Sequence, residues 1–114
     1  MSDDCLFCRI ASGEAESERV AEGDRWVAFR DVNPQAPTHV LVIPRQHVEN
    51  LNDLEPGREE LLGELLMAAR QVAEQEGLDE GYRVVANNDR QAGQSVFHLH
   101  FHVLGGRAMG WPPG

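Results

Sequence analysis

Residues 95–104, Ser95-Val96-Phe97-His98-Leu99-His100-Phe101-His102-Val103-Leu104, carry a histidine at every second position from 98 to 102. Side chains of a β-strand point to opposite faces in turn, so this alternation predicts a strand over 97–104. One face would carry the three histidines. The other face, made of Leu99, Phe101 and Val103, would pack into the core. Each imidazole has two ring nitrogens that need partners, which makes three of them a poor choice for ordinary burial. The histidine face is therefore either a reactive site or a partly exposed polar surface.

Two kinds of chemistry suit the histidine face. Alternate histidines on a strand can reach one zinc ion at about 2.0 to 2.1 Å, with a further ligand from elsewhere. Alternatively, a neutral imidazole can attack an electrophilic phosphorus while its neighbours fix its tautomer and supply positive charge. The preceding Gly93-Gln94-Ser95 offers backbone N–H groups and a hydroxyl that could face an oxyanion or protonate a leaving group. These groups favour phosphate chemistry, because a plain metal site does not need them.

The rest of the chain combines short apolar strands with one long helix. Apolar residues recur at helical spacing from about residue 55 or 56 to residue 76, and Gly77 provides the stop. The other expected elements are a short helix at 5–12, strands at 19–21, 26–30, 40–43 and 82–86, and loops at 33–37 and 87–95. Strands and helices do not alternate regularly in this order. It therefore predicts an α+β fold with a mainly antiparallel sheet, in one domain spanning 1–114.

Composition narrows the possible functions. The chain has 114 residues and a net charge of −9, which disfavours nucleic-acid polymers and anionic membranes as partners. All ten basic residues are arginine, so a lysine nucleophile, a Schiff base and a P-loop lysine are excluded. Acidic residues stand where a secretory signal would carry bases, and no apolar run is long enough to span a membrane. We therefore expect a cytoplasmic protein.

The histidine stretch and several other segments resemble one protein family. His98 to Leu104 matches the pattern His-φ-His-φ-His-φ-φ, with φ apolar, of the histidine triad superfamily. Together with this stretch, further segments resemble its branch of histidine triad nucleotide-binding proteins: Asn33-Pro34-Gln35-Ala36-Pro37-Thr38-His39, Val42-Ile43-Pro44-Arg45-Gln46-His47, Gly93-Gln94-Ser95-Val96, Gly105-Gly106-Arg107 and Trp111-Pro112-Pro113-Gly114. The resemblance covers residues 5–114 and implies the fold of this family, with sheets joined across a homodimer through the long helix and the strand from Tyr82.

The resemblance also implies an activity. It points to a hydrolase that cleaves the P–N bond of purine nucleoside 5′-phosphoramidates through a nucleotidyl-histidine intermediate. His100 would be the nucleophile, His102 would contact the phosphate, Ser95 would assist the leaving group, and His39 would orient the triad. On the substrate side, Asp31 would bind the ribose hydroxyls and Asn87 the ribose or phosphate. Phe7, Ile10, Phe29 and Val32 would line the purine pocket, Gly93 and Gln94 would border the phosphate, and Trp111 would reach toward the partner's active site.

Cys5 and Cys8 form a Cys-x-x-Cys pair near the start of the chain. In a reducing cytosol such a pair is more often metal-binding or redox-active than a structural disulfide. A tetrahedral zinc site needs two further ligands, and the candidates are His47 and the first triad histidine, His98. Similar zinc sites occur in triad relatives with this cysteine pair, whereas many histidine triad nucleotide-binding proteins lack the cysteines. We expect a structural zinc here, the alternative being two small buried cysteines.

Other functions remain open at this point. A dinucleoside polyphosphate hydrolase or nucleotidyltransferase would use the same imidazole attack, although the Trp-Pro-Pro-Gly ending disfavours it. A nucleotide-binding module without catalysis and a zinc hydrolase with the three triad histidines as ligands are further alternatives. Three of these site residues also have simpler interpretations: Asp31 as a turn acid, and Asn87 and Ser95 as loop caps.

Overall fold

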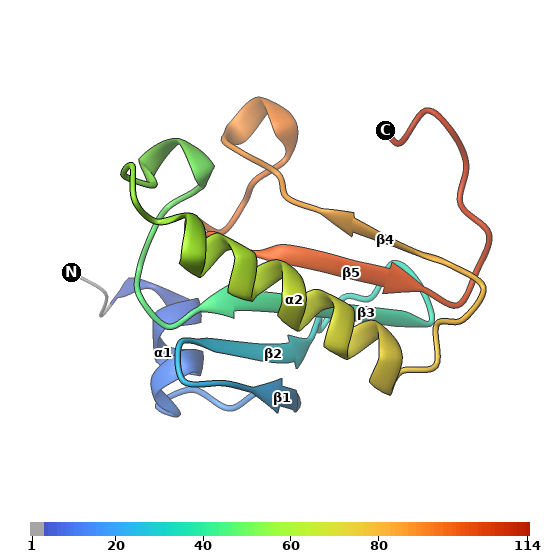
Figure 1. The fold of residues 1–114 in the computed structure, drawn as a ribbon, viewed down its shortest axis with the longest axis horizontal. Helices are drawn as coiled ribbons and strands as arrows, with labels where there is room; N and C mark the ends of the chain where they lie inside the picture. Colours follow the sequence, from blue (N-terminus) through green and yellow to red (C-terminus); the bar gives the residue numbers. More distant parts are fainter. Residues whose placement is uncertain (1–3) are drawn as a thin grey trace.

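The structure is a computed structural model and describes residues 4–114. Its elements follow in the order α1 (Leu6–Ser12), β1 (Arg19–Glu22), β2 (Trp26–Arg30), β3 (Thr38–Pro44), the 3₁₀ helix η2 (Leu51–Asp53), α2 (Glu59–Gln75), β4 (Tyr82–Val85), the 3₁₀ helix η3 (Arg90–Ala92) and β5 (Phe101–Gly105). The strands form one antiparallel sheet in the order β1-β2-β3-β5-β4. This arrangement confirms the predicted α+β class (Figure 1).

The histidine stretch keeps its predicted alternation, but the strand is shorter than expected. Strand β5 begins at Phe101 and not at residue 97. In a continued register, Leu99 would lie opposite Pro44 of β3, which has no N–H to offer a ladder. The Leu99 N–H donates instead to the Val48 carbonyl oxygen at 2.6 Å, which takes residues 97–100 out of the sheet. Leu99 still packs with the core on one side, as predicted.

The long helix also starts later than predicted. Residues 56 and 57 form a turn, and α2 begins at Glu59 and not at 55 or 56. Gly57 has a φ of +96°, in the left-handed region that favours glycine over a residue of the helix. The stop at Gly77 is confirmed, since this residue follows the helix with a φ of +70°. The two 3₁₀ helices were not predicted.

Two apolar cores lie on opposite faces of the sheet. The larger packs α2 against residues such as Ala28, Val40 and Phe101, and the smaller packs α1 against the alternate residues of β2 and β3. Strand β3 is buried along its whole length because both of its faces are covered. Figure 1 shows α2 crossing the front of the sheet and α1 behind it, at the left of the view beside β1 and β2. None of the helices among residues 4–114 is long and apolar enough to cross a membrane.

The end of β2 is tied to the end of α2 by an ion pair. Both Arg30 Nη atoms donate to the two Glu76 carboxylate oxygens at 2.9 Å. The Arg30 hydrogen bonds lower the pKa of Glu76 below its ordinary value. Ionised Glu76 therefore stabilises the folded protein at every pH above the pKa that this group has in the unfolded chain. The stabilisation is lost as the pH falls through the lower pKa that it has in the folded protein.

We therefore expect Glu76→Gln to reduce the free energy of unfolding at pH 7 by about 1 kcal/mol. The difference from wild type should shrink as the pH falls below about 4.5, because protonated Glu76 no longer pairs with Arg30. Urea unfolding at pH 7 and pH 3 measures both values. Glu74→Gln, at an exposed position two residues away, is the control and should change little at either pH. A difference for Glu76→Gln that did not depend on pH would contradict this account.

Candidate functional site

A cavity of about 630 Å³ opens on the α1 side of the sheet. Its lining combines residues of α1, the segment before β1, the end of β2 with the loop that follows, β3, and the chain leading into β5. These residues are Leu6, Phe7, Ile10, Glu16, Ser17, Glu18, Phe29, Arg30, Asp31, Val32, Asn33, Gln35, His39, Leu41, Gly93, Ser95, Val96, His100 and His102. The cavity thus has an apolar end, near α1, and a histidine-rich end.

Most of the predicted catalytic and substrate-binding residues come together in this cavity. The lining contains His39, Ser95, His100 and His102 of the predicted catalytic set, and Phe7, Ile10, Phe29, Asp31, Val32 and Gly93 of the predicted substrate set. Gly93 has a φ of +100°, which lets the chain turn from η3 toward Ser95 at the cavity. Phe7 stands edge-on to Phe29, with ring centroids 5.4 Å apart, and these rings form part of the apolar end.

Three predicted substrate residues do not line the cavity: Asn87, Gln94 and Trp111. Gln94 is buried, and its side chain supports the neighbouring loops. Its Oε1 accepts hydrogen bonds from Asn50 Nδ2 and the Asp89 N–H, and its Nε2 donates to the carbonyl oxygens of Glu49 and Val96. Trp111 lies in the C-terminal tail and is 83% exposed. Figure 1 shows this tail leaving β5 and passing beyond β4, where Arg83 Nη2 donates to the Gly110 carbonyl oxygen at 2.7 Å.

His100 is held in one tautomer by the backbone. Its Nδ1 lies 2.7 Å from the His98 carbonyl oxygen. A carbonyl oxygen only accepts, so Nδ1 carries the proton and Nε2 keeps its lone pair. Burial lowers the pKa of His100, which keeps the ring neutral at pH 7. The ring of Phe7 stands edge-on to it, with centroids 5.2 Å apart. His100 therefore has the protonation state of a nucleophile.

His102 is held in the opposite tautomer by a chain of hydrogen bonds. The Gln35 N–H donates to His39 Nδ1 at 3.0 Å, so the proton of neutral His39 is on Nε2. This Nε2–H donates to His102 Nδ1 at 2.9 Å, which leaves the proton of His102 on its own Nε2. The pKa of His102 is lowered to about 4, mainly by burial and to a smaller extent by the nearby His100 and His39. His102 Nε2 is buried and has no hydrogen-bond partner among the described residues. It is thus a neutral N–H donor beside His100.

Asp31 has two roles in the loop after β2. Its Oδ1 accepts the Asn33 N–H at 2.8 Å, which is the turn interpretation of this residue. Its Oδ2 lies 3.4 Å from His39 Nε2. Burial lowers the pKa of His39, so this contact is not an ion pair at pH 7. Because Asp31 also lines the cavity, its carboxylate is within the site as well as part of the turn.

The two cysteines meet two histidines next to the cavity. One ligand atom from each of Cys5, Cys8, His47 and His98 lies within 4.8 Å of every other. His98 Nδ1 is 3.3 Å from Cys5 Sγ and 3.5 Å from Cys8 Sγ, and His47 Nδ1 is 3.3 Å from Cys8 Sγ. Two ligands at normal Zn–S and Zn–N lengths around a tetrahedral ion would be about 3.5 Å apart. The four residues therefore fit a zinc ion.

The orientation of His98 supports the same fit. Its Nε2 lies 2.8 Å from the Pro44 carbonyl oxygen, which accepts and so places the ring proton on Nε2. Nδ1 then keeps its lone pair and faces the cysteines. A hydrogen bond from the other ring nitrogen to a carbonyl is the usual support of a metal-ligating histidine.

The alternative of three triad histidines around one catalytic zinc does not fit. Both ring nitrogens of His98 are engaged elsewhere, and His100 Nδ1 is bound to the backbone. Among residues 4–114, the other ligand cluster joins Asp31, His39 and His102. Its two histidine nitrogens are only 2.9 Å apart, whereas two nitrogens on one zinc would be about 3.3 Å apart. The shorter distance is that of a hydrogen bond.

Several lining residues escaped the sequence prediction. Gln35 acts through its backbone N–H, so its residue type carries no signal. Glu16, Ser17 and Glu18 lie in the segment before β1, for which no site residue was predicted. Leu6 could have been found, because it is one turn of helix α1 away from Ile10, which was predicted to line the pocket.

Known proteins share the sequence pattern and the overall fold of this chain. A model of the HIT domain family matches residues 12–109. A protein of Brassica juncea described as a 14 kDa zinc-binding protein is 49% identical over 113 residues, covering 97% of this chain and 100% of its own length. The crystal structure of a HIT family hydrolase from Legionella pneumophila is 49% identical, with a TM-score of 0.95 over 97% of this chain and 100% of that one. A histidine triad nucleotide-binding protein from Candida albicans is 34% identical, with a TM-score of 0.82 over 96% of this chain and 83% of that one.

Proposed function

The chain belongs to the HIT domain family, and from this premise we propose that it is a hydrolase that cleaves the P–N bond of purine nucleoside 5′-phosphoramidates. One observation carries the proposal: the rings of His100 and His102 line the same cavity, His100 keeps a lone pair on Nε2, and His102 Nε2 carries a proton and has no partner among the described residues. A nucleophile beside a neutral donor suits attack on a phosphorus that carries negative oxygens. Two relatives described as a hydrolase and a nucleotide-binding protein support this class of reaction.

The first step forms a bond between His100 Nε2 and the phosphorus and breaks the P–N bond. The electron pair of the broken bond stays on the amine, which takes up a proton by way of the Ser95 hydroxyl at the cavity. The ring of His100 becomes positively charged, and the His98 carbonyl oxygen stabilises it through the Nδ1–H. The His102 Nε2–H donates to a phosphate oxygen as charge develops there.

The second step releases the nucleotide. Water attacks the phosphorus and gives up one proton, which replaces the proton that Ser95 passed to the amine. The bond to His100 breaks and its electron pair returns to Nε2, so the products are a nucleoside monophosphate and free, neutral His100. The apolar end of the cavity, with Phe7, Ile10, Phe29 and Val32, receives the purine, and Asp31 accepts hydrogen bonds from the ribose hydroxyls. Asp31 would thereby favour ribonucleotides over deoxyribonucleotides.

The activity is tested with adenosine 5′-phosphoramidate and diadenosine polyphosphate in parallel, each with and without a chelator. We expect release of adenosine monophosphate and amine from the phosphoramidate, unaffected by brief chelation, because no reacting group is held by a metal. Faster cleavage of diadenosine polyphosphate would favour the alternative hydrolase. Binding of adenosine monophosphate without cleavage of either substrate would favour a nucleotide-binding module.

We further propose that Cys5, Cys8, His47 and His98 hold a structural zinc. All four ligands would be protein groups, so the ion has no open position for substrate. When bound, it would cross-link the start of α1 to the chain after β3 and to the chain before β5. The zinc-binding relative from Brassica juncea supports this assignment.

We also propose a homodimer. Strand β4 lies at an edge of the sheet, where its backbone can pair with a second chain. Tyr82 and Val84 are exposed apolar residues of this edge strand, and α2 also exposes Leu66. Sedimentation should therefore give twice the chain mass of 12.7 kDa, and a monomer at micromolar concentration would contradict the proposal.

A further inference from the structure

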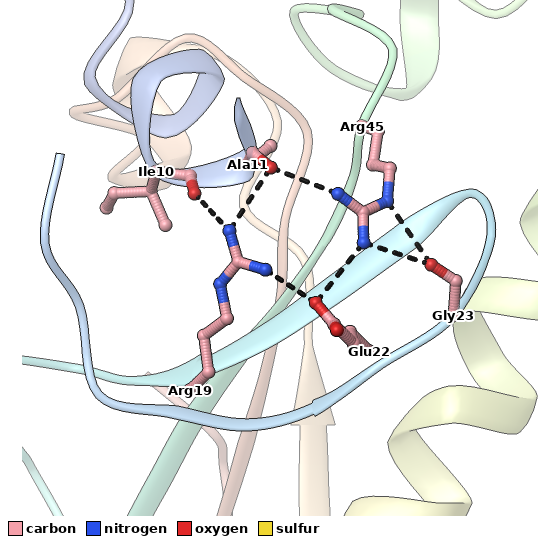
Figure 2. A network of polar contacts seen from close by, with 6 residues as sticks. All are labelled: Ile10, Ala11, Arg19, Glu22, Gly23 and Arg45. Carbon is pink, nitrogen blue, oxygen red and sulfur yellow. Dashed lines mark hydrogen bonds and ion pairs between the residues drawn. The ribbon is translucent and has the colours of Figure 1, made fainter. Parts of the chain in front are cut away.

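The carboxyl end of α1 is held by two arginines from elsewhere in the chain. Arg19 Nη2 donates to the Ile10 carbonyl oxygen at 2.6 Å and to the Ala11 carbonyl oxygen at 3.2 Å. Arg45 Nη1 donates to the same Ala11 oxygen at 3.0 Å. Figure 2 shows the two guanidinium groups converging on Ala11 from different sides. Carbonyl groups at a helix end lack partners within the helix, and cations are favourable there.

Glu22 and Gly23 complete the network. Glu22 Oε1 accepts from Arg19 Nη1 at 2.5 Å and from Arg45 Nη2 at 3.3 Å, so one carboxylate offsets the repulsion between two cations. Arg45 also donates through Nε and Nη2 to the Gly23 carbonyl oxygen, both at 3.2 Å. We call Arg19, Glu22 and Arg45 the arginine clamp. It joins α1 to β1, to the turn between β1 and β2, and to the residue that follows β3 (Figure 2).

Helix α1 needs such support. It has only seven residues, and a helix of this length is unstable by itself. Its amino end carries the cysteines of the proposed zinc site, and its carboxyl end carries the carbonyls bound by the clamp. Between these ends, Leu6, Phe7 and Ile10 line the cavity. The clamp therefore determines where one wall of the purine pocket stands.

We propose that Arg19, Glu22 and Arg45 are positioning residues that set the affinity of the pocket for the nucleoside, an inference that rests on the proposed function. They do not line the cavity themselves. The hydrogen bonds that hold His100 and His102 come from His98, His39 and the loop after β2. Helix α1 meets His100 through the ring of Phe7, in its first turn and away from the carbonyl groups that the clamp holds. Loosening the carboxyl end of α1 thus changes nucleoside binding and leaves the reacting groups in place.

The test uses the zinc-loaded protein and its variants Arg45→Met, Arg19→Met and the double variant. Methionine keeps much of the apolar stem and removes every donor. The control is Arg25→Met, which removes an arginine with a bidentate ion pair to Glu64, on the α2 side of the sheet. The measurements are the Kd of adenosine monophosphate by calorimetry, KM and kcat for the phosphoramidate, zinc content, and amide exchange of residues 6–12.

We expect Arg45→Met to raise Kd and KM by about fivefold to twentyfold, with kcat within about twofold of wild type and zinc retained. Exchange in 6–12 should become faster. The double variant should lose less than the product of the two single effects, because Arg19 and Arg45 share the Ala11 oxygen and Glu22. Arg25→Met should leave Kd and exchange in 6–12 unchanged.

The failures of the two proposals are distinguishable. Tight binding by wild type with equal Kd values for Arg45→Met and Arg25→Met would overturn the clamp alone. Equal losses in kcat and zinc content for Arg45→Met would also overturn it, because the effect would then be general unfolding. A wild-type protein that neither binds adenosine monophosphate nor cleaves the phosphoramidate would overturn the proposed function, and with it the role of the clamp in affinity.

Discussion

Replacing His100 with alanine is expected to lower kcat for phosphoramidate cleavage by at least about 10⁴-fold, because the variant has no group that can bond to phosphorus. His100 attacks through Nε2, because its other ring nitrogen, Nδ1, donates to the His98 carbonyl oxygen. Neither His98 nor His102 can take over. The ring nitrogens of His98 face the cysteines and Pro44, whereas His102 accepts from His39 at Nδ1 and carries its proton, and so no lone pair, at Nε2. Initial rates with excess substrate, measured by amine release, give the loss directly.

Two further measurements make the His100 result specific. The variant should still bind adenosine monophosphate with a Kd close to that of wild type, because the apolar end of the cavity is unchanged. After denaturant quench during turnover, wild-type protein should carry one nucleotidyl group, and His100→Ala should carry none. Turnover that survived in the variant would show that another group attacks the phosphorus.

Removal of zinc is the second change with a large expected effect. Cys8→Ser should abolish zinc binding and lower the free energy of unfolding by about 3 to 5 kcal/mol, because a bound structural zinc contributes its binding energy to folding. For a chain of this size such a loss lowers Tm by more than about 10 °C. Metal analysis and thermal unfolding, each with and without a chelator, measure the two effects.

The same experiment contains its control. Prolonged chelation should destabilise wild type to about the level of Cys8→Ser and have no effect on the variant. It should also reduce kcat more than it raises KM, since the His98 carbonyl oxygen that holds His100 belongs to a proposed zinc ligand. Substoichiometric zinc in protein purified without added metal, together with unchanged stability in chelator, would contradict the assignment.

Local patterns predicted much of the fold. The alternation around His100 assigned Leu99, Phe101 and Val103 to the core, and all three are buried there. Strand β2 was predicted at 26–30 and found at Trp26–Arg30, because a Gly-containing turn and a proline loop delimit it. The start of β5 was wrong because it depends on Pro44, a residue more than fifty positions away that meets it only in the folded sheet.

The candidate site was predictable where residue type decides the chemistry. Histidines and cysteines are common in catalytic and metal sites, so they could be selected from the sequence. The structure brings each of them to the cavity or to the metal cluster. For Gln94 the residue type did not decide the role. Its place in the Gly93-Gln94-Ser95 segment predicted contact with substrate, whereas its side-chain amide binds neighbouring loops. Gln35 contributes a backbone N–H, and no property of its side chain signals that role.

Residue 98 has two roles that use different parts of it. Its carbonyl oxygen accepts the hydrogen bond from His100 Nδ1, and its side chain belongs to the proposed zinc site. Phosphorus chemistry needs only a carbonyl oxygen at that place, and every amino acid has one. The imidazole of residue 98 faces the cysteines through Nδ1 and the Pro44 carbonyl oxygen through Nε2, and neither contact involves His100. The side chain and the main chain of residue 98 are therefore separable. Joint replacement of Cys5, Cys8 and His98 would remove ligands of the proposed zinc and still leave a carbonyl oxygen for His100, provided that packing kept the backbone of residue 98 in place.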